Sequence, residues 1–101
     1  MRKGDNATLK MRKILYVQGS MDERVHLATV LQYDEKKEYI YFLLKEGKLT
    51  DLILDAIYEC QIQTEKEHLN CTGRIKERYC GKEGKIFKIE IENGFYKINL
   101  K

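Results

Sequence analysis

The sequence predicts an all-β fold, a small antiparallel split β-barrel of six or seven short strands. Apolar and polar residues alternate along several segments, as they do in strands that bury one face. Turn-forming residues separate these segments at close spacing, and no segment shows a helical apolar pattern long enough for a crossover between parallel strands. At 101 residues, the chain is expected to form a single domain over residues 1–101.

The first expected strand covers residues 14–17, and a turn over residues 19–22 leads into a second strand over residues 25–33. In that second strand the larger apolar residues occupy odd positions, and His26, Ala28 and Gln32 lie between them. The odd positions are therefore expected to face the core. They are Val25, Leu27, Leu31 and Tyr33.

Residues 39–44 are apolar on both faces, which is typical of a central strand or one that is covered twice. Its aromatic residues Tyr39, Tyr41 and Phe42 could stack nucleic-acid bases, but no arginine or lysine is interleaved with them. We expect all three in the core.

The segment that follows, residues 50–56, is ambiguous. Thr50 could cap a helix with Leu52, Ile53 and Ala56 at helical spacing, but the apolar stripe is only about two turns long, and isolated helices of that length are marginal. We expect this segment to be extended or irregular.

Two hairpins are expected to complete the chain. A two-residue loop at Glu65 and Lys66 would join strands over residues 57–63 and 69–75. Asn93 and Gly94, which both tolerate positive φ, would join strands over residues 86–91 and 95–100. The first register predicts the inward pairs Tyr58–Gly73, Cys60–Cys71 and Ile62–Leu69, and the second predicts Phe87–Leu100, Ile89–Ile98 and Ile91–Tyr96.

The three cysteines, Cys60, Cys71 and Cys80, match neither a paired zinc motif nor a disulfide framework. We expect reduced thiols, with Cys60 and Cys71 buried and Cys80 exposed in a turn over residues 79–84. A zinc site formed by the three cysteines and His68 is the alternative. No cofactor is expected.

Composition restricts the function classes. The net charge of +3 comes from 19 basic and 16 acidic residues spread along the chain, which is too balanced to indicate nucleic-acid binding by itself. No apolar run approaches the roughly 18 residues of a membrane span, and no apolar stretch follows the charged N-terminal residues as in a signal peptide. The expected location is the cytoplasm, without membrane contact.

No residues are arranged as a catalytic motif. His26 and His68 occupy polar positions of their strands and are expected at the surface, without a nearby nucleophile in a recognisable pattern. The acidic residues cluster at expected turns, where carboxylates are common. We therefore expect a protein that is not an enzyme.

Read end to end, the segments ILYVQG, RVHLATVLQYDEKKEYIYFLL and LDAIYECQIQTEKEHLNCTGRIKERYCGKEGKIFKIEIENGFYKINL resemble the N-terminal PilZ-like domain of the flagellar brake family. The resemblance covers roughly residues 9–100 and lies in the strand rhythm and in loose A-x-V-L and G-x-I positions. It implies a split barrel that acts in motility or cyclic di-GMP signalling. In that family the nucleotide is held by a second domain, through R-x-x-x-R and D/N-x-S-x-x-G motifs.

The stretch GRIKERYC contains an R-x-x-x-R pair, Arg74 and Arg78, with Lys76 between them. In a regular strand all three side chains would point to the solvent side, with the two arginines about 13 Å apart. That rigid face cannot enclose a compact ligand, and no D/N-x-S-x-x-G turn accompanies it. We expect a solvated basic stripe formed by Arg74, Lys76 and Arg78, which does not bind cyclic di-GMP in the PilZ manner. Contact with a partner or phosphate through these three residues is the alternative.

Two classes of function follow. The first is a regulatory module that binds a protein partner. The second is a small barrel that binds nucleic acid through a basic face, which would require the arginines and lysines to lie together. The basic residues involved would be Arg2, Lys3, Lys10, Arg12 and Lys13, together with Arg74, Lys76 and Arg78.

Overall fold

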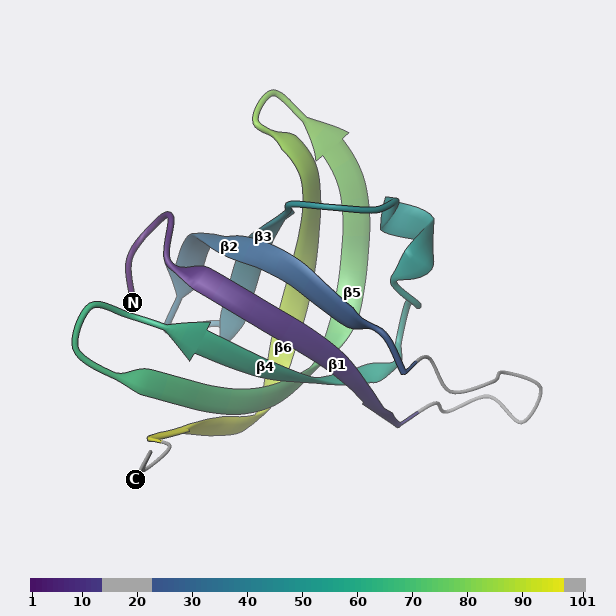
Figure 1. Cartoon of the computed structure of the whole chain (residues 1–101). Helices are drawn as coiled ribbons and strands as arrows, with labels where there is room; N and C mark the ends of the chain where they lie inside the picture. The colour runs from purple at the N-terminus through teal and green to yellow at the C-terminus, as the bar shows by residue number, and fades with distance from the viewer. Residues whose placement is uncertain (14–22, 98–101) are drawn as a thin grey trace.

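The computed structural model describes residues 1–13 and 23–97, whose strands form one closed antiparallel barrel (Figure 1). The strands lie in the order β1-β2-β3-β6-β5-β4, and β1 closes the barrel by pairing with β4. This confirms the predicted small all-β barrel. The strands are β1 (Asn6–Lys13), β2 (Val25–Asp34), β3 (Tyr39–Leu44), β4 (Ile57–Gln63), β5 (His68–Gly81) and β6 (Gly84–Lys97).

The first strand of the structure was missed by sequence reasoning. The strand predicted over residues 14–17 and the turn over residues 19–22 lie outside the described residues. β1 instead precedes them, with Ala7, Leu9 and Met11 buried and the residues between them more exposed. The sequence signal for this strand is the short alternation of apolar and polar residues in NATLKMRK. It is weak because Ala7 is small and several of the other residues are basic.

β2 was predicted with the wrong face inward. His26, Ala28 and Val30 are buried, whereas Val25 and Leu27 are 56% and 38% exposed. The neighbouring strands decide the phase, because Leu9 of β1 lies opposite His26. A β-bulge between Val30 and Gln32 then shifts the alternation, so that Tyr33 packs against the core as predicted although Leu31 is only half-buried.

β3 lies between β2 and β6, which agrees with the predicted central position. Its inner face, with Ile40, Phe42 and Leu44, is buried, and Phe42 stacks on Phe87 of β6 with ring centroids 5.3 Å apart. The core prediction is correct for Phe42 and wrong for the two tyrosines, which lie on the outer face and are half-buried.

The predicted hairpin between β4 and β5 is confirmed, with its turn at Glu65 and Lys66. All three predicted inward pairs occur. Gly73 is needed here, because a Cβ atom at this position would lie 2.3 Å from Cγ2 of Ile89 and 2.6 Å from the carbonyl oxygen of Glu90. The glycine therefore lets β5 and β6 approach closely beside Tyr58.

The hairpin predicted at Asn93 and Gly94 is wrong. Both residues lie inside β6, and neither has a positive φ. β6 pairs with β5 along most of its length and with β3 over its first half, so folding it back would replace pairings on both sides. The turn between β5 and β6 is at Lys82 and Glu83, within the turn predicted over residues 79–84, but β5 reaches Gly81 instead of ending at residue 75. The paired partners predicted at residues 98 and 100 lie outside the described residues.

The segment between β3 and β4 closes one end of the barrel. It contains a single 3-10 turn, η1 (Leu49–Asp51), and is otherwise irregular, as predicted for most of residues 50–56. Leu52 and Ala56 are buried and join the core formed by the strands. Among the described residues, no helix is long and apolar enough to cross a membrane.

Candidate interaction surface

The predicted basic stripe does not form one face. A β-bulge between Ile75 and Glu77 adds Lys76 to β5 as an extra residue, which reverses the alternation of side chains beyond it. Arg74 lies opposite Glu90 on the outer face. Arg78 lies opposite Phe87, which is fully buried, so its side chain starts on the inner side of the sheet.

Each of the three basic residues has its own partner inside the chain. The Arg74 guanidinium donates to the carboxylate of Glu92 through Nε at 2.9 Å and Nη2 at 2.8 Å. Lys76 forms an ion pair with Asp55 at 3.5 Å, and Arg78 donates to the backbone carbonyl oxygen of Leu52. The structure therefore separates the two arginines of GRIKERYC instead of joining them into a phosphate clamp.

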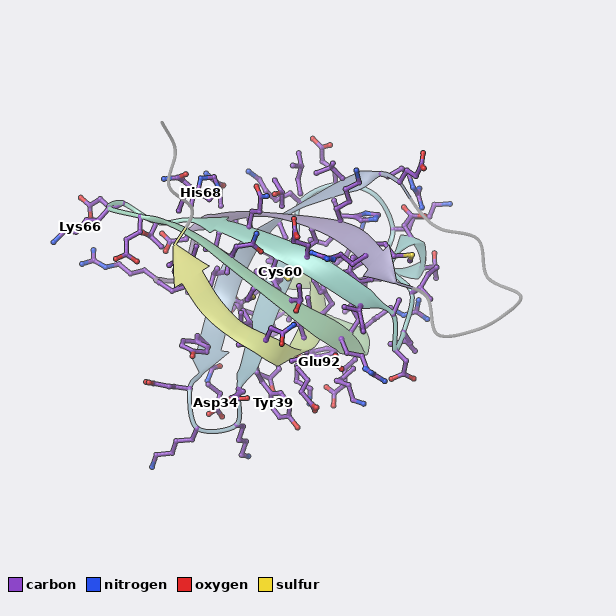
Figure 2. All side chains as sticks on the ribbon, turned by 90° about the horizontal axis from the view of Figure 1, so that it is seen from below. Asp34, Tyr39, Cys60, Lys66, His68 and Glu92 are labelled. Carbon is purple, nitrogen blue, oxygen red and sulfur yellow. The ribbon has the colours of Figure 1, made fainter. Side chains whose placement is uncertain are left out.

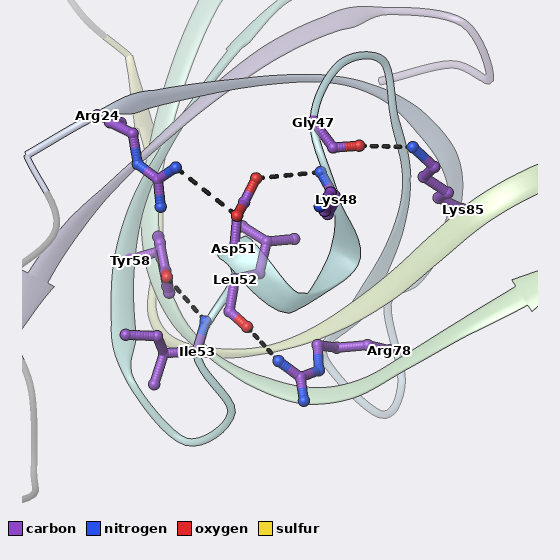
Figure 3. A network of polar contacts seen from close by, with 9 residues as sticks. All are labelled: Arg24, Gly47, Lys48, Asp51, Leu52, Ile53, Tyr58, Arg78 and Lys85. Atoms are coloured by element: carbon purple, nitrogen blue, oxygen red, sulfur yellow. Dashed lines mark hydrogen bonds and ion pairs between the residues drawn. The ribbon is translucent and has the colours of Figure 1, made fainter. Parts of the chain in front are cut away.

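Arg78 belongs to a network that fixes η1 over the barrel end (Figure 3). The Asp51 carboxylate accepts from the Lys48 backbone N–H at 3.0 Å, and Arg24 lies 3.7 Å from it. These contacts, with the Lys48 N–H as the main cause, hold the pKa of Asp51 below its ordinary value. The Ile53 N–H donates to the hydroxyl of buried Tyr58 at 3.0 Å. The network has a structural role, because it satisfies polar groups around a buried plug.

The outer face of β3 and β6 carries an aromatic and charged group that the sequence did not reveal. Tyr39 lies on the outside of the barrel close to Asp34 and the turn between β2 and β3 (Figure 2). Lys88 of β6 places its ammonium 4.3 Å from the Tyr39 ring centroid and 6.0 Å from that of Tyr41. A hydrogen bond to the Glu77 carboxylate raises the pKa of Lys88 above its ordinary value. The lysine comes from another strand, so spacing along one segment could not indicate this group.

An apolar row runs across the outer face toward the turn between β5 and β6. Leu43, Ile86 and Tyr79 lie side by side on β3, β6 and β5 in register. Ile86 is only 6% exposed, whereas Tyr79 is 42% exposed. Gly81 leaves room for the row, because a Cβ atom at this position would lie 2.7 Å from Cδ1 of Ile86. The row therefore presents a large aromatic side chain on a well-packed apolar base.

The burial of the cysteines follows the prediction, but Cys80 lies in β5 and not in a turn. Cys60 and Cys71 lie opposite each other and are fully buried, while Cys80 is exposed near the end of β5. The hydrogen bond with Cys71, together with burial, raises the pKa of the Cys60 thiol well above its ordinary value. The zinc alternative receives no support, since the described residues contain no group of three or more histidine, cysteine or acidic side chains that could hold a metal.

The histidine prediction is half wrong. His26 is 7% exposed and packs edge-on against Tyr58, with ring centroids 6.0 Å apart. His68 is half-buried at the start of β5, and its Nδ1 atom has no hydrogen-bond partner among the described residues. Sequence reasoning placed His26 at the surface because it assigned the wrong inner face to β2.

Two pockets formed by described residues are small and lined mainly by polar or exposed residues. One, of about 280 Å³, lies between the N-terminal residues and the turn between β4 and β5. Another, of about 230 Å³, lies beside η1 and β2 and contains the Arg24–Asp51 ion pair. Neither has the apolar, enclosed lining that is usual for small-molecule sites.

Comparison with known protein families, with curated proteins and with solved structures finds no match.

Proposed function

We propose that this chain is a non-enzymatic interaction module that binds a protein partner through its outer apolar row. The observation that carries the proposal is the position of Tyr79, which is 42% exposed beside buried Ile86 and half-buried Leu43. Rigid aromatic side chains on a packed apolar base are the residues that dominate binding energy in protein interfaces. The charged group around Lys88 borders the row and would form the polar rim.

The chemistry of the reactive side chains supports a non-enzymatic role. Two of the three thiols are buried, and a raised pKa keeps Cys60 in its unreactive neutral form. His26 packs inside the barrel against Tyr58. These buried groups stabilise the core and are not accessible as nucleophiles, which leaves Cys80 as the exposed thiol.

Nucleic-acid binding has less support than a protein partner. Basic residues at several separate places are already paired with carboxylates. On the outer face of β5 and β6, Glu77, Glu90 and Glu92 lie among the aromatic and basic residues, which opposes binding of a phosphate backbone. The resemblance to the flagellar brake family supplies the pathway part of the proposal, namely a partner in motility or cyclic di-GMP signalling.

The test is site-specific crosslinking in the source cells, with a photoreactive amino acid in place of Tyr79. The matched control carries it in place of Lys66, which is also exposed but lies on the turn between β4 and β5. We expect a defined protein adduct from position 79 and none from position 66, and Tyr79→Glu should weaken the same complex. Equal adducts at both positions, or recovery of nucleic acid alone, would contradict the proposal. Binding that falls steeply with salt would identify phosphate as the ligand.

A further inference from the structure

The hairpin between β5 and β6 projects beyond the rest of the barrel, and one edge of its tip has no strand of the described residues beside it (Figure 1). β4 accompanies β5 only as far as the pair Ile57–Arg74, and backbone hydrogen bonds from the segment before β4 end at Ile75. β6 continues beside β5 to Gly81. Within the described parts of the chain, residues 77–81 thus have a neighbouring strand on the β6 side only. We call this free side of residues 77–81 the open edge.

The backbone pattern shows which groups point to the open edge. Ile75 donates its N–H to Ala56, so its backbone points away from β6. On β6, Ile91 donates its N–H to the carbonyl oxygen of Glu38, so the backbone N–H and C=O groups of Ile91 point away from β5. The same holds for every second residue before it, including Phe87. Arg78 lies opposite Phe87, and in an antiparallel ladder the two residues of such a pair direct their backbone groups away from each other. The N–H and C=O groups of Arg78 therefore point away from β6.

The same alternation applies to Cys80, two residues further along β5. The open edge therefore presents the N–H and C=O groups of Arg78 and Cys80, spaced as a strand presents them to its neighbour. Among the described residues, no backbone hydrogen bond reaches these groups from the side opposite β6. Both residues lie at least partly in solvent, so water satisfies these groups until another strand replaces it.

The hairpin tip, residues 77–85, carries three basic side chains, Arg78, Lys82 and Lys85, and two acidic ones, Glu77 and Glu83. Its acidic residues are already paired, Glu77 with Lys88 and Glu83 with Lys3. Two of its cations, in contrast, donate to neutral backbone carbonyl oxygens, so their charge is not compensated there. These are Arg78, which bonds to Leu52, and Lys85, which bonds to Gly47.

The geometry points to the open edge as the binding site for an extended, acidic segment of a protein partner, which adds to the sheet as a strand beside β5. This inference rests on the proposed function and specifies its binding mode. The backbone groups of Arg78 and Cys80 supply main-chain hydrogen bonds, and Tyr79 offers an apolar contact on the outer face. Carboxylates of the segment are attracted to Arg78 and Lys85.

A peptide fits this edge better than a nucleic acid does. The edge alternates donors with acceptors, which a peptide backbone matches, whereas a phosphate backbone offers acceptors only and would leave the carbonyl groups without partners. The bulge at Lys76 and the tip charges also discourage indiscriminate strand pairing, since bulges and lysines are the usual protection of exposed edges. The edge therefore selects for a segment of opposite charge.

The experiment uses random linear peptides displayed on phage and selected on the full chain. A selected peptide is then made synthetically, and its affinity is measured by fluorescence anisotropy. Cys80→Pro removes the N–H at the open edge without breaking a bond to β6, and Cys80→Ala is the matched control that keeps this N–H. We expect acidic peptides with alternating apolar residues, and about tenfold weaker binding to Cys80→Pro than to Cys80→Ala. Amide hydrogen exchange of the unmodified chain is the second measurement, with slower exchange expected at Arg78 and Cys80 when the peptide is bound.

Several results would overturn the inference. These are equal affinity of the two folded variants, unchanged exchange at both amides, or a selection that yields no peptide. Binding of a single-stranded oligonucleotide that displaces the selected peptide from the edge would assign the site to nucleic acid instead. The proposed function and this inference can be tested independently of each other. If the complex captured from position 79 forms equally well with Cys80→Pro and Cys80→Ala, the protein partner stands and the open edge is not its site.

Discussion

The guanidinium of Arg78 donates a hydrogen bond to the backbone carbonyl oxygen of Leu52, which ties the end of β5 to the segment that plugs the barrel. Replacing Arg78 with alanine leaves that half-buried carbonyl without its charged donor. We expect Arg78→Ala to lower the free energy of unfolding by about 1–3 kcal/mol. Urea denaturation measures this difference.

Arg74→Ala is the matched control, because it removes the other arginine of the same motif. The side chains of Arg74 and Glu92 are each roughly two-thirds buried, but their ion pair lies on the outer face of the barrel. We expect a loss of about 1 kcal/mol or less, as for most surface ion pairs. A larger loss in Arg74→Ala than in Arg78→Ala would contradict the different roles assigned to the two residues.

Gly73→Ala should disrupt the contact between β5 and β6. The new methyl group would overlap with the side chain of Ile89 and the backbone of Glu90, so neighbouring residues must move. We expect thermal unfolding to show a loss of about 1–3 kcal/mol or more. Gly94→Ala is the control, since a Cβ atom there meets no described atom within 4 Å, and it should stay within about 0.5 kcal/mol of the unmodified chain.

Asp51 should make stability depend on acid pH. Its pKa in the folded protein is lowered, chiefly by the hydrogen bond from the Lys48 N–H and further by Arg24. A lowered folded pKa gives stability that is present above the unfolded pKa and is lost as pH falls through the folded pKa. The stability difference between the unmodified chain and Asp51→Asn should therefore be larger at about pH 7 than at about pH 2. Urea midpoints that stay equally far apart across this range would exclude the effect.

The thiols should differ sharply in reactivity. In the native protein we expect rapid alkylation of Cys80 alone, and Cys80→Ser should abolish it, because Cys60 and Cys71 are fully buried. Unfolding in denaturant should expose all three. The raised pKa of Cys60 also implies that its stabilising contribution is complete below the unfolded thiol pKa and is lost as pH rises through the folded value. Mass spectrometry after brief labelling checks the first point, and rapid native labelling of Cys60 would refute it.

Cyclic di-GMP should not bind this chain in the PilZ manner. Arg74 is engaged by Glu92, and the bulge at Lys76 directs Arg78 to the other side of the sheet. Two guanidinium groups on opposite sides cannot grip one compact ligand with paired hydrogen bonds. Calorimetry at physiological salt should show no saturable binding. A micromolar affinity that disappears in Arg74→Ala or Arg78→Ala would refute this prediction.

The sequence by itself determined the all-β fold and the pairing of β4 with β5. Those strands alternate regularly, and a short turn joins them, so local information was sufficient to pair Cys60 with Cys71. The same reasoning failed at Asn93 and Gly94. There a strong local turn signal lost to the pairing of β6 with strands on both sides, which only barrel closure provides.

Tertiary structure also decided the candidate site. The inner face of β2 depends on β1 and β3, and the bulge that separates Arg74 from Arg78 leaves no mark in their spacing. Lys88 meets Tyr39 only because β6 lies beside β3. The open edge of β5 exists because β4 begins at Ile57, opposite Arg74, whereas the hairpin of β5 and β6 extends beyond that point. Each of these features arises from contacts between residues distant in sequence. The residue pattern of a single segment does not reveal such contacts.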